Sequence, residues 1–220
     1  MDVDDGVRCN DLMTRDAELL RDTVREAGTL SLSLFRTELK NWIKGTSSPV
    51  SEADIRVNDL IENRLRSATS DYGSLSEESV GDKGCLEKCL VWIVDPIDGT
   101  RGYLAGREDW CVSVALVEDA LPLLAAVFAP ASSEFFFAAR GQGTMLNNWS
   151  VYATSGTDLD FSRMAGPKPL VQRLSRSSDE ISLHPRSDRS RFGCVGSHKA
   201  VWTQRLPAVK AVTGTLPQPI

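Results

Sequence analysis

The feature that most constrains this 220-residue chain is a short apolar run that ends in two carboxylates. Residues 90–94 read Leu-Val-Trp-Ile-Val, and residues 95–100 read Asp-Pro-Ile-Asp-Gly-Thr. Apolar residues bounded by charge on one side and by Asp-Pro on the other predict a buried strand that ends at Val94. Asp95 then emerges at the carboxyl end of a strand, where open sheets place their ligands.

Helices are predicted before this strand. The spacing of apolar residues predicts one long helix, or two abutting helices, from about Arg15 to Ile43. Residues 51–54 read Ser-Glu-Ala-Asp, which has the form of a helix start, and apolar residues at helical spacing follow. Two helical segments therefore precede the strand.

Strands are predicted after residue 110. Apolar runs separated by turn residues predict two hairpins, formed by residues 111–117 with 123–128 and by residues 134–138 with 144–146. Helices followed by a meander of strands indicate an α+β fold in which helices pack on a largely antiparallel sheet.

The segment after the buried strand has the chemistry of a metal site. Pro96 fixes the backbone and Gly99 permits a tight turn, so Asp95 and Asp98 can converge with the Ile97 carbonyl between them. Oxygen ligands of this kind suit a hard cation such as Mg²⁺. The alternative is an ordinary turn, because Asp, Pro and Gly are also turn residues.

A short helical turn is expected from Arg101 to Leu104. The amides at its start, at Gly99 and Thr100, could hold a phosphate group. Carboxylates for a cation beside an anion site indicate metal-assisted phosphoryl transfer. Taken alone, Asp54 is more typical of a capping residue and Glu77 of a solvated acidic loop, so the interpretation depends on their joint occurrence.

Three of these segments resemble successive motifs of the inositol monophosphatase family. They are residues 48–54, 76–79 and 92–100, and the likeness extends through residues 129–130 and 141–143, within a span of about 15–185. The resemblance implies a Mg²⁺-dependent, lithium-sensitive phosphomonoesterase that is often dimeric. It also implies the layered α/β/α/β/α architecture of sugar phosphatases, with an incomplete second half here.

Carried over residue by residue, the resemblance also implies roles for individual side chains. The implied metal ligands are Glu77, Asp95, the Ile97 carbonyl and Asp98. Asp54 would assist a further metal site, and Glu77 and Thr100 would orient a water for in-line attack on phosphorus. The amides of Gly99 and Thr100 would hold phosphate oxygens, and Arg101 could meet a second phosphate.

The substrate class is less constrained by the motifs. Residues 98–103 read Asp-Gly-Thr-Arg-Gly-Tyr, which departs from the Thr-Thr-Asn-Phe continuation of inositol monophosphatases. The segment looks closer to bisphosphate nucleotidases, which remove the 3′-phosphate from adenosine 3′,5′-bisphosphate. The small phosphorylated metabolite is therefore expected to be a 3′,5′-bisphosphate nucleotide or an inositol monophosphate.

The end of the chain differs from the family pattern. Family members continue to a Trp-Asp-x-Ala motif whose Asp completes the metal site, whereas Trp202 is followed by Thr203 and Trp-Asp occurs nowhere in this sequence. We expect a phosphatase half at 1–160, the start of a second half at 161–186 and an atypical basic tail at 187–220. A truncated or altered ending would weaken turnover, so a non-catalytic paralogue that binds metal and phosphate is the alternative.

Composition narrows the expected partners and location. The formal net charge is −5, which provides no overall basic field for a nucleic-acid polymer. No apolar stretch approaches the roughly 20 residues that a membrane span needs, and the acidic start lacks the order of a secretory signal. We therefore expect a cytoplasmic protein that does not bind membranes. The family resemblance also implies that the protein could form a homodimer.

Overall fold

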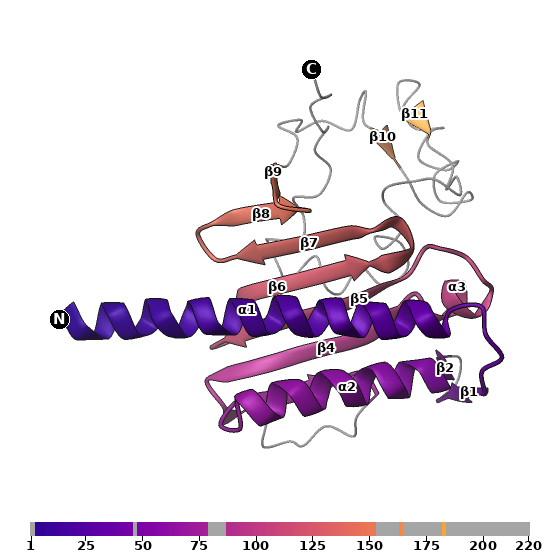
Figure 1. Ribbon diagram of the computed structural model, residues 1–220, viewed down its shortest axis with the longest axis horizontal. Helices are drawn as coiled ribbons and strands as arrows, with labels where there is room; N and C mark the ends of the chain where they lie inside the picture. The colour runs from indigo at the N-terminus through magenta and orange to yellow at the C-terminus, as the bar shows by residue number, and fades with distance from the viewer. Residues whose placement is uncertain (1–2, 46–47, 79–86, 153–162, 165–181, 184–220) are drawn as a thin grey trace.

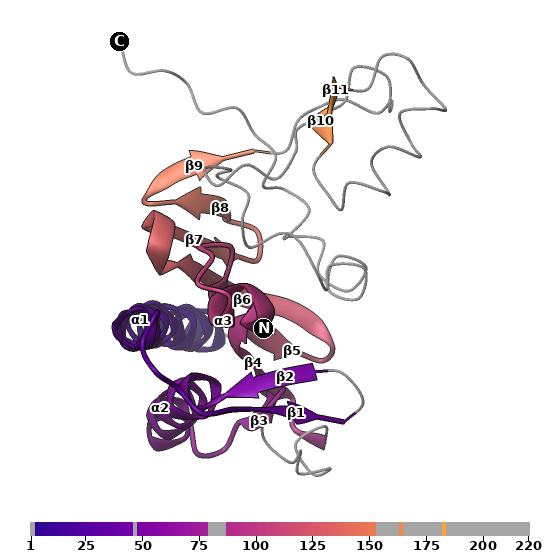
Figure 2. The ribbon, with the colours of Figure 1, turned by 90° about the vertical axis from the view of Figure 1, so that its right-hand side faces the viewer.

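The computed structural model describes residues 3–45, 48–78, 87–152, 163–164 and 182–183, with side chains described from residue 13 to 152. In chain order the elements are α1 (Val3–Leu34), β1 (Asn41–Lys44), β2 (Ser48–Ser51), α2 (Glu52–Ala68), β3 (Gly73–Ser76), β4 (Leu90–Asp98), α3 (Thr100–Leu104), β5 (Cys111–Glu118), β6 (Leu121–Ala129), η2 (Pro130–Ser132), β7 (Glu134–Ala139), β8 (Gly143–Leu146), β9 (Trp149–Val151), β10 (Arg163–Met164) and β11 (Ser182–Leu183). Figure 1 shows α1 and α2 lying in front of one large sheet, and the side view in Figure 2 places both helices on the same face of it.

The large sheet has seven strands in the order β3-β4-β5-β6-β7-β8-β9. Its β3–β4 pair is parallel, and each later neighbour is antiparallel to the strand before it. The predicted α+β class with a largely antiparallel sheet is therefore confirmed, and so are the two predicted hairpins, β5–β6 and β7–β8.

Two of the hairpin turns use backbone conformations that match the twist of the strands. Asp119 and Ala120 join β5 to β6 with φ values of 46° and 63°, and Asn147 and Asn148 join β8 to β9 with 46° and 70°. Positive φ at both central residues is the requirement of the type I′ turn, which suits two-residue hairpins. Asn147 also bonds the neighbouring start of β7, because its Oδ1 accepts from the Phe135 N–H at 2.9 Å.

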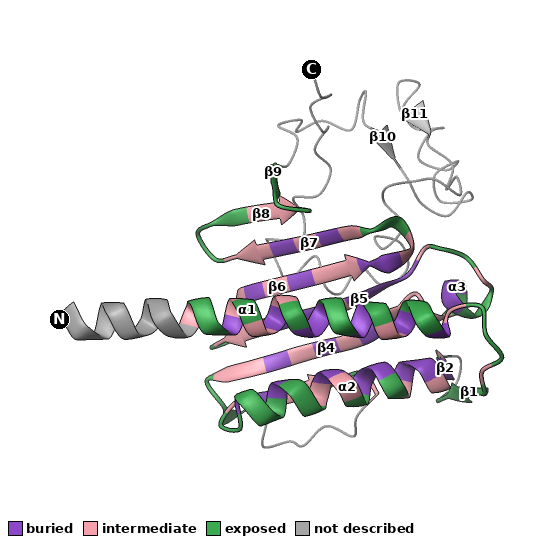
Figure 3. Ribbon diagram, viewed as in Figure 1, coloured by how far each residue is buried: buried purple, intermediate pink, exposed green. Residues whose placement is uncertain are grey.

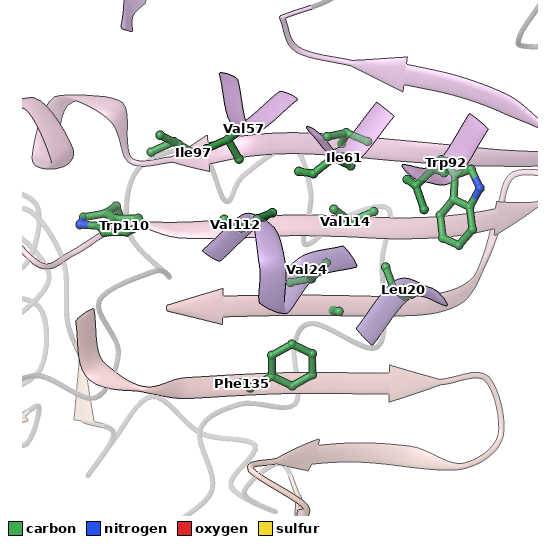
Figure 4. Packing of buried hydrophobic residues seen from close by; sticks show 14 of the residues in the cluster. Leu20, Val24, Val57, Ile61, Trp92, Ile97, Trp110, Val112, Val114 and Phe135 are labelled. Carbon is green, nitrogen blue, oxygen red and sulfur yellow. The ribbon is translucent and has the colours of Figure 1, made fainter. Parts of the chain in front are cut away.

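The hydrophobic core lies between the two helices and the sheet. Figure 3 shows buried residues recurring along α1 and α2, and Figure 4 shows their side chains meeting those of the strands. The largest fully buried side chains are Trp92, Trp110, Leu20, Ile61, Leu65, Ile97, Leu116, Leu124, Val24, Val50, Val57 and Val112. This single helix-on-sheet layer fixes the position of α2 relative to β4, on which the site depends.

The first predicted helix ends earlier than expected. It stops at Leu34 and does not reach Ile43, because Arg36 adopts a positive φ of 60° and its guanidinium bonds the Gly106 carbonyl at 2.9 Å. Asn41–Lys44 instead forms β1, which pairs with β2 around Gly45. The helical spacing that extended to residue 43 therefore included a strand, so that part of the prediction was wrong.

The buried strand is longer than expected. β4 does not end at Val94 but continues to Asp98, with Asp95 opposite Ser113 and Asp98 opposite Cys111. The register shifts between Asp95 and Asp98, where Pro96 has no N–H to give to the ladder. The pairing with β5 resumes beyond this irregularity, which explains why the change of sequence character at Asp95 does not end the strand.

Two further expectations concern the ends and the surroundings of the chain. The boundaries proposed at 160–161 and 186–187, and the tail 187–220, lie outside the described residues. Among the residues that the structure describes, no helix is both long and apolar enough to cross a membrane.

Candidate active site

The predicted site residues come from elements that meet at one edge of the sheet. β3 and β4 run parallel, so their carboxyl ends lie at the same edge, and Glu77 follows β3 directly. The Glu77 N–H donates to the Val94 carbonyl at 3.2 Å, which brings Glu77 beside the start of the Asp95–Asp98 segment. The start of α2 and the short helix α3 lie at this same end of the sheet in Figure 1.

Asp54 is fixed in the first turn of α2 by a reciprocal cap. Its Oδ2 accepts from the Ser51 N–H at 2.8 Å and from the Ser51 hydroxyl at 2.5 Å, while its own N–H points to Ser51 Oγ at 3.4 Å. The predicted helix start is therefore confirmed. Only 2% of Asp54 is exposed, and this burial raises its pKa although the hydrogen bonds act in the opposite direction.

Thr100 connects this buried carboxylate to the end of β4. Its hydroxyl lies 3.0 Å from Asp54 Oδ1 and 3.0 Å from the Ile97 carbonyl, and both can accept its proton. The second carboxylate oxygen of Asp54 therefore holds α3 against α2, as the first holds the cap. A residue that could have been only a cap thus also contacts a predicted site residue.

Four other carboxylates act electrostatically on Asp95. Burial raises the pKa of Asp95 well above its usual value, and the charges of Asp98, Glu77, Asp54 and Glu78 raise it further, in that order. Because each of these groups acts electrostatically on Asp95, they form one acidic edge. An uncompensated cluster of this kind is unfavourable, and a cation placed among the groups would relieve the repulsion.

Lys44 reaches the acidic edge from the β1–β2 hairpin. Its Nζ donates to the Glu77 carbonyl and lies 3.3 Å from Glu78 Oε2. Burial raises the pKa of Glu78, whereas the ammonium of Lys44 acts to lower it. The hairpin thus supplies a positive charge to the rim of the edge, a contact that the sequence did not indicate.

The predicted helical turn is present as α3, and Gly99 makes it possible. Gly99 has a φ of +99°, and a Cβ at this position would lie 2.7 Å from the Asp109 carbonyl. Its own carbonyl accepts from the N–H groups of Gly102 and Tyr103 at 2.7 and 3.0 Å. Arg101 is exposed in the first turn, and the phosphate-binding roles of Arg101 and of the amides at Gly99 and Thr100 stay predictions.

The donor set of the acidic edge suits a hard cation. Carboxylate and carbonyl oxygens, with no thiol or imidazole among them, are the ligands that Mg²⁺ prefers. In the described segments, no three His, Cys, Asp or Glu side chains are already arranged to hold a metal ion. The ligand roles of Glu77, Asp95, Ile97 and Asp98 therefore stay predictions, supported by donor chemistry and by the repulsion at Asp95.

Two buried polar residues behind the edge were missed by the sequence analysis. Asn58 lies one turn after Asp54 on the buried face of α2, and Ser76 ends β3. The Ser76 hydroxyl donates to Asn58 Oδ1 at 2.5 Å. The available signal was a polar side chain four residues from Asp54, between the apolar residues Val57 and Ile61.

Curated relatives of the chain share parts of its sequence. It is 40% identical over 106 residues to an inositol-1-monophosphatase of Rhizobium meliloti, a match that covers 48% of this chain and 40% of the relative. It is 39% identical over 110 residues to Nus factor SuhB of Xylella fastidiosa, covering 50% and 39%. A histidinol-phosphatase of Chlorobaculum parvum is 33% identical over 144 residues, covering 65% and 55%. The chain thus spans about two fifths to just over half of these relatives.

Solved structures share the fold. The extragenic suppressor protein SuhB of Bartonella henselae superposes with a TM-score of 0.66 at 25% identity, over 76% of this chain and 69% of that one. An IMPase/NADP phosphatase, solved with Mg²⁺ and phosphate, superposes with a TM-score of 0.68 at 20% identity, over 78% and 67%. The sequence model of the inositol monophosphatase family matches residues 13–201. The chain belongs to the inositol monophosphatase family.

Proposed function

We propose that this chain is a Mg²⁺-dependent phosphomonoesterase that hydrolyses a small phosphorylated metabolite. The observation that carries the proposal is the acidic edge, where the charges of Asp98, Glu77 and Asp54 raise the pKa of the buried Asp95 and where Asp54 accepts a hydrogen bond from Thr100 at the start of α3. Membership of a family that includes phosphatases supports the reaction class. Mg²⁺ bound to a related fold supports the choice of cation.

Glu77, Asp95, Asp98 and the Ile97 carbonyl would hold the cation. Bound Mg²⁺ supplies positive charge that lowers the pKa of water and stabilises charge developing on the phosphate and the leaving oxygen. The carboxylates would determine the position of the bound cation. Asp54 would assist a further metal site, and its hydrogen bonds with Ser51 and Thr100 hold the buried carboxylate in place.

Thr100 and Glu77 would orient the attacking water. The proton of the Thr100 hydroxyl is directed to Asp54 or to the Ile97 carbonyl, so its oxygen can accept a hydrogen bond from water. Glu77 can accept the second proton of that water as general base. Amides at Gly99 and Thr100 would hold phosphate oxygens while the bond from phosphorus to the leaving oxygen breaks.

The substrate proposal is a 3′,5′-bisphosphate nucleotide or an inositol monophosphate. Arg101, exposed beside the site, favours the bisphosphate because a guanidinium can bind a second phosphate bidentately. Tyr103 does not serve this purpose, since it is 2% exposed and its hydroxyl donates to the Ser31 carbonyl at 2.7 Å. Histidinol phosphate belongs in the substrate panel because one relative is named for it.

The test combines Mg²⁺ titration calorimetry with phosphate release from that panel. We expect Asp95→Asn to abolish Mg²⁺ uptake and phosphate release, and to raise the stability of the metal-free protein by removing a repelled charge. Asp22→Asn is the matched control, because Asp22 is exposed on α1 and far from the edge in sequence. Unchanged Mg²⁺ uptake in the Asp95 variant would show that the acidic edge is not the metal site.

A second candidate is a protein that binds metal and phosphate without turnover. A relative that is named as a Nus factor and not as a phosphatase favours it. Mg²⁺ uptake without phosphate release from any member of the panel would support this candidate over the enzyme.

Homodimerisation also stays a proposal, for which sedimentation of the whole chain is the direct measurement.

A further inference from the structure

The hydrogen bond between Asn58 and Ser76 lies directly behind the acidic edge. Asn58 is 5% exposed and Ser76 is 6% exposed, and the Ser76 hydroxyl donates to Asn58 Oδ1 at 2.5 Å. Asn58 lies on the buried face of α2, between Val57 and Ile61 of the hydrophobic core, and Ser76 is the last residue of β3. A buried polar pair in such a layer adds little stability compared with an apolar pair of the same shape, so another reason for its presence is expected.

The Ser76 hydroxyl makes a second contact that faces the site. Its oxygen accepts from the Glu78 N–H at 3.2 Å. A hydroxyl has one proton, and here that proton is directed to Asn58, which leaves the oxygen lone pairs oriented toward the Glu78 amide. Asn58 therefore sets the direction in which Ser76 can accept a hydrogen bond.

The segment that this contact holds contains the predicted ligand Glu77. Two successive amides are fixed there: the Glu77 N–H by the Val94 carbonyl, and the Glu78 N–H by Ser76. Glu77 itself is exposed, so few side-chain contacts within the protein restrain it. Its direction depends on the backbone on both sides of it.

A single turn of α2 serves both halves of the edge. Asp54 and Asn58 are four residues apart and share the buried face of the helix. Asp54 holds Thr100 at the start of α3, and Asn58 holds Ser76 at the end of β3. A movement of α2 would therefore shift Thr100 and Glu77 together.

We propose that Asn58 and Ser76 are positioning residues that orient the Glu77–Glu78 segment for cation binding. The inference rests on the proposed function, because it requires Glu77 to be a ligand. Loss of a group that orients a ligand typically lowers metal affinity about 10- to 100-fold. Asn58→Ala and Ser76→Ala should each weaken Mg²⁺ binding by at least about tenfold, and the double variant should be little worse than either alone.

The matched control is a second buried hydrogen bond between α2 and the large sheet, made to β4 instead of β3. Thr69, which caps α2, accepts from Trp92 Nε1 in β4 at 2.9 Å and is 3% exposed. It lies at the opposite end of α2 from Asp54, so Thr69→Val should lower stability and leave Mg²⁺ affinity unchanged. Ser76→Thr retains the hydroxyl and should restore most of the Mg²⁺ affinity lost in Ser76→Ala.

The experiment measures three quantities on the whole chain: Mg²⁺ affinity by calorimetry, the urea midpoint without metal, and hydrogen exchange at the Glu78 amide. Faster exchange at Glu78 in the Ser76→Ala and Asn58→Ala variants, with weaker Mg²⁺ binding than in Thr69→Val, supports the proposal. Mg²⁺ affinity equal to that of Thr69→Val overturns it while leaving the metal site intact. A wild-type chain that takes up no Mg²⁺ overturns the proposed function, and the positioning role falls with it.

Discussion

Gly99 gives the sharpest test of how the start of α3 is built. An alanine at a φ of +99° adopts a conformation that costs an L-residue about 1–2 kcal/mol. Its Cβ would also lie 2.7 Å from the Asp109 carbonyl and 3.2 Å from Trp110 Cα, and backbone cannot move away as a flexible side chain can. Overpacking of this kind adds about 1–3 kcal/mol, so Gly99→Ala should lower the free energy of unfolding by about 3 kcal/mol.

Gly141→Ala is the control that separates these two contributions. Gly141 has a φ of +76°, but a Cβ there would meet nothing within 4 Å, so the loss should be about 1 kcal/mol. Urea unfolding followed by circular dichroism measures both variants, provided that the denaturant dependence stays the same. Equal losses in the two variants would refute the claim that contact with residues 109–110 makes Gly99 necessary.

Two other predictions concern the packing of α1. The Tyr72 hydroxyl donates to the buried Asp16 carboxylate at 2.8 Å, and burial together with Asp16 raises the pKa of Tyr72 to about 12. Tyr72→Phe should lower the free energy of unfolding by about 1 kcal/mol at neutral pH. This difference between the two proteins is fully present below the unfolded pKa of about 10 and is lost as the pH rises through about 12. A difference in stability that does not change with pH would contradict the prediction. Arg21 Cζ lies 3.4 Å from the centroid of the Phe137 ring, so Arg21→Met should lower the free energy of unfolding by about 0.5–1 kcal/mol. If the same loss of stability is measured in a Phe137→Leu background, the contact between Arg21 and Phe137 is not its cause.

Local sequence patterns predicted the elements whose boundaries depend on neighbouring residues. The cap at Ser51 is an example, because Ser51 and Asp54 satisfy one another within one turn. The boundaries that were wrong depend on partners distant in sequence. Arg36 ends α1 by reaching Gly106, and β4 continues past Asp95 because β5 pairs with it on the far side of the irregularity.

The same distinction applies to the acidic edge. Asp95 and Asp98 could be named because their motif has the residue types of oxygen ligands. Asp54 could be named because of its joint occurrence with the other acidic groups and because of the family resemblance. The pairing of Asn58 with Ser76 could not be predicted, because the two residues are 18 positions apart and meet only when α2 packs against β3. The contact of Lys44 with the Glu77–Glu78 segment was likewise missed, because residues 41–43 of the strand that carries Lys44 were predicted as the end of a helix.

The direction of the short strand β3 determines which insertions and length changes the chain can accept. Glu77 lies next to Asp95 only because β3 points the same way as β4; a reversed β3 of four residues would displace it by roughly 13 Å, beyond the reach of any shared ion. A slip of one residue in the pairing would instead turn Ser76 away from the helix. Insertions between β3 and β4 should therefore be accepted when they preserve strand polarity and register, and length changes within β3 should not.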